Sequence, residues 1–315
     1  MNASEVDLSV QIGPLSLKNP IVAASGTVAY GDEMRSFLDW SQVGGIVGKT
    51  ITLKPRKGNV PPRTAETPSG LLNSIGLQNE GIESFLARTL PAMRELKTAV
   101  IVNIGGFDTG EFSRLLDALE KEDGIAAIEL NISCPNVDDG GMFLDRDPDE
   151  IRSLLESLRP MTRLPLIVKL TPNVSDILIV ARAAMDGGAD ILSVANTYFG
   201  LGVDWRTRKP IVAAGTAGVS GPAIKPLSLR HAWVVASNLK APVMGIGGIM
   251  NAQDALEYMV AGAACVQVGT ANFVDPGVCA KIVEEMRSLL AEAGVRHVRD
   301  IIGTLQMPGG DASPS

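Results

Sequence analysis

The sequence places one cysteine and two lysines where each could take part in chemistry. Cys134 lies just past the strand pattern at 128–132, in which Ile128, Leu130 and Ile132 are apolar, and stands among asparagines; a partly desolvated thiol in such a position can act as a base or a nucleophile. Lys169 ends an otherwise apolar run, and Lys49 follows another, so a buried ammonium there needs an anion or an electron-rich ring nearby. A flavin suits Lys169, because the reduced ring carries negative charge around N1 and O2.

Each of these residues also has a plainer interpretation. Free cysteine is among the most often buried residue types, and a lone lysine at a strand end can extend its head group to solvent. His231 and His297, the two histidines of the chain, fall in patterns that predict helices and suit surface or structural roles. Cys134, Cys265 and Cys279 lack Cys-x-x-Cys spacing, so the chain offers neither a disulfide framework nor a complete zinc or iron–sulfur site.

Composition and charge exclude several classes of function. The chain has 315 residues, of which 45% are hydrophobic and 4% aromatic, as in a globular protein with a large aliphatic core. Its net charge of -7 and its scattered basic residues argue against a nucleic-acid partner. No signal-like core follows the N-terminus, and no run approaches the roughly 20 apolar residues of a bilayer span. We therefore expect no membrane partner and a cytoplasmic location.

Short β-branched or aliphatic runs recur along the chain, each followed by a loop and an amphipathic, helix-like stretch. The eight predicted strands are Pro20–Ala24, Val43–Gly48, Ala99–Asn103, Ala126–Ile132, Leu166–Leu170, Ile191–Ala195, Val243–Ile246 and Cys265–Val268. The predicted helices lie near 31–40, 79–96, 109–121, 148–159, 175–187, 226–239, 251–262 and 276–293. Such units predict a (β/α)8 TIM barrel. An open doubly wound sheet would need a Gly-x-Gly-x-x-Gly turn after the first strand, which is absent.

Other segments are expected to add to this barrel. The residues on either side of Gly13-Pro14 predict a β-hairpin that closes the bottom of the barrel. We expect a single domain over residues 1–315, with residues 1–5 and about 306–315 flexible. Long active-site loops follow several strands. One of them, 135–142, is either a mobile lid or a plain surface loop.

The residues just past the predicted strands test the barrel hypothesis, because in a barrel they converge at one end. All of them are polar or glycine: Ser25, Lys49, Asn103, Asn131, Lys169, Asn196, Gly247-Gly248 and Gly269-Thr270. The glycines after the seventh and eighth strands are typical of a phosphate site, since phosphate can approach the backbone N–H groups closely there. Ser220-Gly221 could add another N–H group, although by itself this segment indicates only a tight turn.

From about Leu8 to Phe273 the sequence resembles the class 1 dihydroorotate dehydrogenases in the order and spacing of its motifs. These are Asn19-Pro20, Ala24-Ser25-Gly26, 44–50 (GGIVGKT), 73–79 (NSIGLQN), 129–136 (ELNISCPN), 169–173 (KLTPN), Asn196-Thr197 and 220–226 (SGPAIKP). Cysteine at position 134 is typical of class 1, whereas class 2 relatives use serine and carry an N-terminal membrane segment. The segment Gly76-Leu77-Gln78-Asn79 is similar to class 1B.

The resemblance implies an FMN-dependent enzyme that oxidises (S)-dihydroorotate to orotate in UMP biosynthesis, with one FMN per chain. Cys134 would take the C5 proton while hydride passes from C6 to N5 of FMN. Electrons would continue to NAD+ through a separate partner subunit that carries FAD and a 2Fe-2S cluster. The expected assembly is a homodimer of this chain with one electron-transfer subunit on each half, a heterotetramer.

The resemblance also implies roles for individual residues. Besides Cys134, Lys49 would be catalytic. FMN would be held by Ser25, Lys49, Thr50, Asn103, Asn131, Lys169, Ala195, Gly221, Gly247, Gly248, Gly269 and Thr270. Dihydroorotate, with a carboxylate and two ring amides, would be bound by Lys49, Asn73, Ser74, Ile75, Gly76, Leu77, Asn131, Asn196 and Thr197.

Three other functions stay open at this point. A class 1A enzyme would reduce fumarate directly, without a partner subunit. A dihydropyrimidine dehydrogenase-like barrel would act on uracil, but Asn136 stands where that family is expected to have histidine. A non-catalytic scaffold barrel would need neither Cys134 nor the two lysines.

Overall fold

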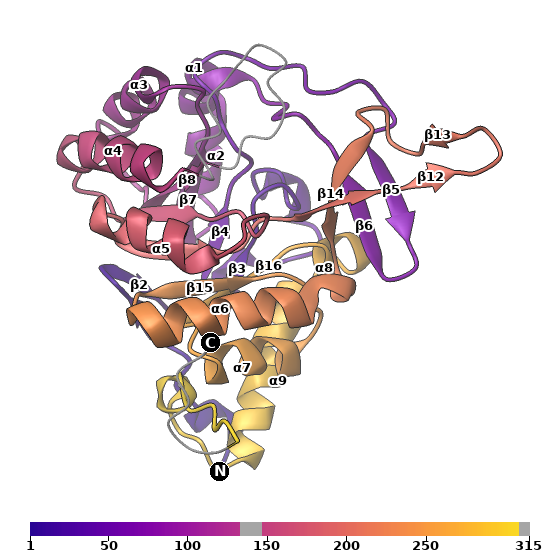
Figure 1. Cartoon of the computed structure of the whole chain (residues 1–315). Coiled ribbons are helices and arrows are strands. Elements are labelled where there is room, and N and C mark those ends of the chain that lie inside the picture. Colours follow the sequence, from indigo (N-terminus) through magenta and orange to yellow (C-terminus); the bar gives the residue numbers. More distant parts are fainter. Residues whose placement is uncertain (133–146, 309–315) are drawn as a thin grey trace.

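Eight parallel strands close into a barrel in the computed structural model, which describes residues 1–132 and 147–308 (Figure 1). Around the barrel the order is β3 (Ile21–Ala23), β4 (Gly45–Val47), β7 (Ala99–Ile104), β8 (Ala127–Asn131), β9 (Leu166–Lys169), β10 (Ile191–Val194), β15 (Val243–Ile246) and β16 (Cys265–Val268). Strand β16 pairs with β3 and closes the barrel. The predicted (β/α)8 barrel is confirmed, and each predicted strand matches within two residues at either end.

The barrel strands are buried on both faces, because their side chains point alternately into the barrel and toward the surrounding helices. Most of these side chains are β-branched or aliphatic, which explains the continuous apolar runs in the sequence. The exceptions are buried polar residues of the strands: Asn103, Glu129, Asn131, Lys169, Ser193 and Gln267. Each of these needs a partner, since an unsatisfied polar group inside a protein is destabilising.

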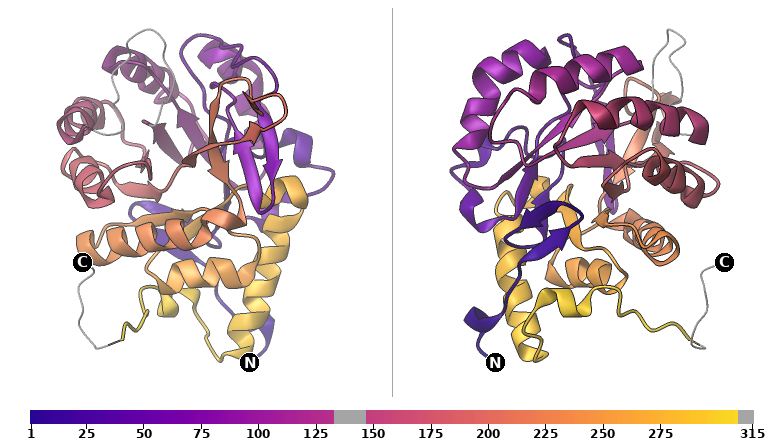
Figure 2. Two further views of the ribbon diagram at one scale, coloured as in Figure 1. Left: turned by 45° about the vertical axis from the view of Figure 1, so that its right-hand side comes forward. Right: turned by 90° about the vertical axis from the view of Figure 1, so that its left-hand side faces the viewer.

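Helices surround the barrel in the described part of the chain (Figure 2). The longer ones are α3 (Thr109–Leu119), α4 (Pro148–Leu158), α5 (Ile177–Asp186), α6 (Lys225–Leu239), α7 (Ala252–Val260) and α9 (Val278–Glu292). Four of them begin where an Asx side chain accepts a hydrogen bond from the first turn: Asp108, Asp147, Asp176 and Asn251. No helix within residues 1–132 and 147–308 combines the length and the hydropathy required to cross a bilayer.

The helix predicted over residues 31–40 is wrong. This segment contains only the 3-10 helix η2 (Asp32–Met34) and the first residue of η3 (Trp40–Gln42). Gly31 has φ 91°, and its carbonyl oxygen accepts a hydrogen bond of 2.9 Å from the indole Nε1 of Trp40. The chain therefore turns around the buried indole, a tertiary contact that overrides the helical pattern.

Residues 79–96 are helical as predicted, but in three parts. These are α1 (Gly81–Ser84), the π-helical segment η4 (Phe85–Thr89) and α2 (Leu90–Arg94). The π segment ends two residues before Pro91, which has no N–H group for an α-helical hydrogen bond. A further short helix, α8 (Ala271–Val274), follows β16 and was not predicted.

The two histidines have structural surroundings. His231 lies in α6 as predicted, and its Nδ1 is 3.1 Å from the hydroxyl of Tyr198. The helix predicted around His297 is wrong at that residue, which precedes the 3-10 helix η7 (Val298–Ile301). Its backbone pairs with Asp7 in an isolated β-bridge, so the N-terminal segment holds it in an extended conformation.

The predicted N-terminal hairpin is confirmed and follows η1 (Ala3–Glu5). Strands β1 (Val10–Ile12) and β2 (Leu15–Leu17) pair in antiparallel register, with alternate side chains buried. At its tip, a Cβ on Gly13 would lie 3.1 Å from the carbonyl oxygen of Asp190 and 3.6 Å from Pro242. These two residues precede β10 and β15, so the hairpin covers the amino-terminal end of the barrel.

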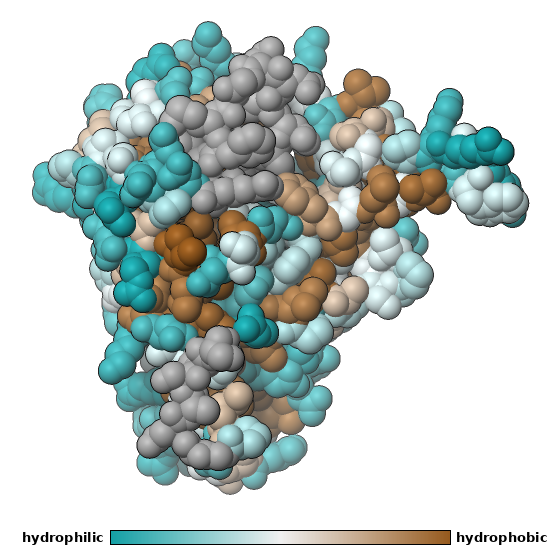
Figure 3. Space-filling view, in the orientation of Figure 1, coloured by the Kyte–Doolittle hydropathy of each residue, from teal (hydrophilic) through white to brown (hydrophobic). Residues whose placement is uncertain are grey.

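An antiparallel sheet that was not predicted projects from the barrel (Figure 1). Its strands lie in the order β11 (Tyr198–Leu201), β14 (Thr216–Ser220), β6 (Gly70–Asn73) and β5 (Thr64–Thr67), and β12 (Val203–Asp204) and β13 (Lys209–Pro210) form a hairpin beyond it. We call this sheet and hairpin the arm. It joins the long segments that follow β4 and β10. Figure 3 shows hydrophobic side chains along the arm and hydrophilic ones at its tip.

Candidate active site

A cavity of ≈ 270 Å³ lies at the carboxyl ends of the barrel strands, beside the inner strands of the arm. Every described residue that was predicted to bind FMN or substrate lines it: Ser25, Lys49, Thr50, Asn73, Ser74, Ile75, Gly76, Leu77, Asn103, Asn131, Lys169, Ala195, Asn196, Thr197, Gly221, Gly247, Gly248, Gly269 and Thr270. The structure thus brings these residues together, while their individual roles stay predictions. Cys134 and the loop 135–142 lie outside the described residues.

Two lysines are the charged side chains among the described residues of the lining. Lys169 ends β9 and is only 7% exposed. Lys49 follows β4, and its pKa is lowered, first by burial and then by the positive charge of Lys169. Two ammonium groups in one cavity give it a positive potential, which favours an anionic ligand.

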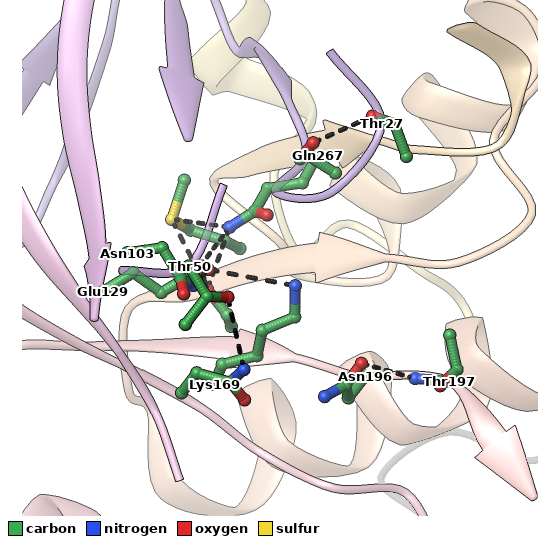
Figure 4. Close-up of polar contacts among 12 residues, drawn as sticks. Thr27, Thr50, Asn103, Glu129, Lys169, Asn196, Thr197 and Gln267 are labelled. Carbon is green, nitrogen blue, oxygen red and sulfur yellow. Dashed lines mark hydrogen bonds and ion pairs between the residues drawn. The ribbon is translucent and has the colours of Figure 1, made fainter. Parts of the chain in front are cut away.

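A buried carboxylate, Glu129, lies inside the barrel next to Lys169 (Figure 4). Its Oε1 accepts a hydrogen bond of 2.6 Å from Asn103 Nδ2 and lies 3.8 Å from Lys169 Nζ. Its Oε2 accepts hydrogen bonds from Ser193 Oγ at 2.7 Å and from Gln267 Nε2 at 2.6 Å. Strands β7, β9, β10 and β16 thus supply the partners of one carboxylate on β8.

Sequence reasoning assigned no role to Glu129, Ser193 or Gln267. The signal in the sequence was the presence of a glutamate and a glutamine within apolar strand patterns, because such residues are rarely buried without specific partners. That signal identifies buried polar residues but not their partners, which come from strands far apart in the sequence.

Two amide oxygens in the cavity have no hydrogen-bond donor among the described residues. They are Oδ1 of Asn103 and Oδ1 of Asn131, both buried. The Nδ2 atom of Asn131 lies 3.5 Å from Thr50 Oγ1. A buried acceptor without a donor is destabilising, so both positions favour a ligand with N–H groups in a planar ring. This arrangement fits the isoalloxazine ring of FMN.

The turn after β15 is tightly packed and suits a phosphate group. Gly247 and Gly248 have φ of 129° and 68°, and a Cβ on Gly248 would lie 2.7 Å from the backbone nitrogen of Lys225. The Lys225 side chain pairs with Asp254, and the hydroxyl of Tyr258 donates to the Gly247 carbonyl at 2.8 Å. A rigid glycine turn at the first residue of a helix is a favourable place for an anion.

Polar side chains at the opposite rim of the cavity come from the segments that also form the arm. Asn73 Nδ2 donates to the Gly218 carbonyl at 3.3 Å, which joins β6 to β14. The backbone N–H of Thr197 donates to Asn196 Oδ1 at 2.9 Å, and the two side chains lie next to each other in Figure 4. Asn173 Nδ2 donates to the Thr197 carbonyl at 3.0 Å. These contacts hold several amides in place beside Lys49.

Apart from Asn73 and Ser220, the sequence did not predict the part of the lining that the arm contributes. These residues are Thr64, Leu71, Phe199, Thr216, Ala217 and Gly218. Their strands are short and include several glycines, and the pairing of β6 with β14 joins segments widely separated in sequence. No local periodicity could have revealed that pairing.

The two described cysteines differ from a reactive thiol. Cys265 and Cys279 are fully buried and free. Burial raises the pKa of Cys279 to about 12. The pKa of Cys265 is also raised, by burial and then by the charge of Glu129. Neither thiol therefore suits proton transfer at neutral pH.

The chain is similar to known proteins over nearly its whole length. Residues 7–290 match the family model described as dihydroorotate dehydrogenase. A protein of Geotalea uraniireducens named dihydroorotate dehydrogenase B (NAD(+)), catalytic subunit, is 48% identical over 95% of this chain and 98% of its own length. Proteins with the same name from Geobacter sulfurreducens and Bacteroides thetaiotaomicron are 47% and 45% identical over 96% of this chain and 99% of theirs. The chain belongs to the dihydroorotate dehydrogenase family.

Proposed function

We propose that this chain is the FMN-dependent catalytic subunit of a class 1B dihydroorotate dehydrogenase. Family membership makes it an oxidoreductase that acts on dihydroorotate in pyrimidine biosynthesis. The observation that carries the proposal further is the convergence of Lys49, Lys169 and several asparagines in one cavity at the carboxyl end of the barrel. An anionic substrate and a redox cofactor with ring N–H groups would both be stabilised there.

The residues around the cavity divide into two groups in this proposal. Lys169, Asn103 and Asn131 would hold the flavin ring through one cation and two amides. Gly221, Gly247, Gly248, Gly269 and Thr270 would hold the phosphate, and Ser25, Thr50 and Ala195 would contact the remainder of FMN. When bound, FMN supplies an acceptor for the hydride from C6 of dihydroorotate.

Substrate binding is assigned to the rim formed by the arm. Lys49 would pair with the carboxylate of dihydroorotate, while Asn73, Asn131, Asn196 and Thr197 would bind the ring amides. The segment from Ser74 to Leu77 lines the same side of the cavity. This mixture of one cation and several donor–acceptor amides matches an anionic ring with two N–H and two C=O groups.

Cys134 is proposed as the base that takes the C5 proton. It follows β8 by three residues in the sequence, and β8 ends with Asn131 in the cavity lining. The buried positions of Cys265 and Cys279 support Cys134 as the reactive thiol of the chain.

The proposal also covers the path of the electrons from reduced FMN to their final acceptor. The printed names of the relatives include NAD(+) and the words catalytic subunit, which favour an assembly with a second kind of chain. We propose that this partner carries FAD and a 2Fe-2S cluster, and that the complete enzyme is built on a homodimer of the present chain. Direct reduction of fumarate by the isolated chain, without NAD+ reduction by the assembly, would contradict this part.

The experiment that tests the activity is an anaerobic absorbance spectrum before and after addition of L-dihydroorotate. Bleaching of an oxidised flavin band is expected, and Cys134→Ala should bleach much more slowly with the same FMN content. A bound flavin that dihydroorotate leaves oxidised in the unsubstituted protein would contradict the assignment.

A further inference from the structure

We propose that Glu129 is a positioning residue that keeps Lys169 protonated, and that it thereby controls how strongly the cavity stabilises negative charge on a bound flavin. The consequence for the flavin rests on the proposed binding of FMN. The claim about the proton on Lys169 concerns only residues of this chain.

Lys169 needs a counter-charge. Its side chain is 9% exposed, and its one ion pair with the residues that the structure describes is the contact with Glu129. Burial disfavours the ammonium form of a lysine, and a second ammonium nearby disfavours it further. Lys49 supplies that second charge, because the two lysines line the same cavity and the positive charge of Lys169 contributes to the lowered pKa of Lys49.

Glu129 is the carboxylate that meets this need. Its side chain is 0% exposed, and its Oε1 lies 3.8 Å from Lys169 Nζ. The cavity lining itself contains no aspartate or glutamate among the described residues. Opposite charges at this separation attract much more strongly inside a protein than in water.

The hydrogen bonds of Glu129 hold the carboxylate in place. Asn103, Ser193 and Gln267 all donate to it, from three different strands. An ionised carboxylate only accepts hydrogen bonds, and all three of these partners are donors, so the surroundings of Glu129 match its ionised form. Ser193 Oγ also accepts from Gln267 Nε2 at 3.0 Å, which connects two of the donors. The network therefore orients a charge, which a purely apolar layer of the barrel would not do.

The titratable described groups around the Glu129–Lys169 pair are Lys49 and Cys265. Burial and the charge of Glu129 raise the pKa of Cys265, so its thiol stays neutral through the neutral pH range. Cys134 lies outside the described residues. All proteins compared should therefore carry Cys134→Ala, so that this thiol does not titrate.

The central variant is Glu129→Gln, which removes the charge and nearly preserves the shape. The Asn103 and Gln267 side chains each have an amide oxygen without a partner among the described residues. Rotation of either amide group would present an acceptor to the new NH2 group, so hydrogen bonds can form again in the variant. Glu129→Asp keeps the charge but shortens the side chain by one methylene group, and Lys169→Met removes the ammonium.

The first readout is nuclear magnetic resonance of lysine labelled with carbon-13 at Cε, with Lys169 assigned by its loss in Lys169→Met. In spectra recorded from about pH 6 to 9, Lys169 should lose its proton at lower pH in Glu129→Gln than with Glu129 present, because the opposite charge that favours the ammonium is removed. In Glu129→Asp, whose carboxylate is withdrawn by one methylene group, the loss of the proton should occur at lower pH than with Glu129 and at higher pH than in Glu129→Gln. This measurement does not depend on FMN.

The second readout is the reduction potential of bound FMN across the same pH range. At the alkaline end of the range, the reduction potential of FMN in Glu129→Gln should approach the potential in Lys169→Met. Relative to the protein with Glu129, the ratio of reduced to oxidised flavin at a fixed potential should fall about tenfold, which is about 30 mV for a two-electron couple. With Glu129 present, this step is expected only at higher pH. A matched control is Asp190→Asn, which neutralises a carboxylate paired with Arg159 at 2.6 Å near the opposite end of the barrel and should change neither readout.

Several results would overturn the proposal. One is a Lys169 that stays protonated at all pH values in folded Glu129→Gln, and another is a potential that shifts without a pH-dependent step. A loss of stability with an unchanged lysine titration would show that Glu129 is only structural. If Glu129→Gln does not fold, Glu129→Asp decides: a lowered Lys169 titration midpoint supports the proposal and an unchanged one opposes it. If the protein binds no FMN, the proposed function fails while the lysine titration still decides this inference.

Discussion

The two ends of the barrel consist of the same eight strands but differ in the residues that cover them. At the amino-terminal end the hairpin packs Val10, Ile12, Leu15 and Leu17 against the barrel, all buried. At the carboxyl-terminal end the strands present lysines, asparagines and glycines to a cavity. Burial of apolar area at the amino-terminal end stabilises the folded protein. The carboxyl-terminal end instead holds buried charges and unpaired acceptors, which are unfavourable without a ligand. Stability and chemistry are thus separated along the barrel axis.

Inside the barrel, between the apolar amino-terminal end and the cavity, lies a layer of buried polar side chains. Glu129 and its donors Asn103, Ser193 and Gln267 are as buried as the apolar residues. Their hydrogen bonds satisfy both oxygens of the Glu129 carboxylate, and its Oε1 lies 3.8 Å from Nζ of Lys169, a lysine of the cavity. A substitution there should affect both stability and the site.

The largest expected effect on function comes from Lys49→Met at the carboxyl end. Loss of the cation proposed to bind the substrate carboxylate should lower kcat/KM about 100- to 1,000-fold. The free energy of unfolding should stay the same or rise, because a buried ammonium with a lowered pKa is removed. Steady-state kinetics and urea unfolding of the FMN-loaded protein measure the two effects. A decrease of less than tenfold would contradict the assigned role.

For Ile12→Ala at the amino-terminal end, we expect a loss of stability with little change in activity. Ile12 is 1% exposed, so its truncation should lower the free energy of unfolding by about 2–5 kcal/mol. Below the unfolding transition, kcat/KM should remain within about twofold of its original value. Gln11→Ala, at an exposed position of the same strand, is the control and should change stability by less than about 1 kcal/mol. A selective loss of activity in Ile12→Ala would show that the two ends are coupled.

A smaller effect is expected for Gly248→Ala. A Cβ there would lie 2.7 Å from the Lys225 backbone nitrogen, at a φ of 68°. We expect a loss of about 1–3 kcal/mol in stability and an FMN affinity at least about tenfold weaker. Gly294→Ala is the matched control, because Gly294 has φ 73° but a Cβ added there would meet nothing within 4 Å. Equal FMN affinities in the two variants, measured by fluorescence titration, would argue against a phosphate at this turn.

The smallest effect concerns the pH dependence of orotate binding. Burial and then Lys169 lower the pKa of Lys49, so its ammonium is lost at a lower pH than that of a free lysine. Orotate affinity should therefore fall as the pH rises through this lowered pKa. Lys49→Arg should remove the decrease, because a guanidinium group stays charged. The same lowered pKa means that the unfolded chain binds more protons, so this residue's contribution to the free energy of unfolding rises with pH in that window.

Much of the fold could be predicted from the sequence, since the barrel depends on local patterns. Runs such as Leu166–Val168 are aliphatic and partly β-branched because parallel strands are buried on both faces, and amphipathic segments between them form the outer helices. Polar residues at the strand ends could be assigned to one cavity because parallel strands in a barrel all end on the same side.

Only the tertiary structure decided the features that depend on contacts between distant segments. The turn around Trp40 replaced a predicted helix, and the arm pairs Asn73 with Gly218. Glu129 was visible in the sequence as an acidic residue in an apolar strand, but its three donors and its lysine come from four other strands. The periodicity of hydrophobic residues in the sequence indicates which residues of a helix or strand are buried. Which groups they meet depends on how the barrel closes, because hydrogen bonds and ion pairs are set by distances of a few ångströms between separate strands.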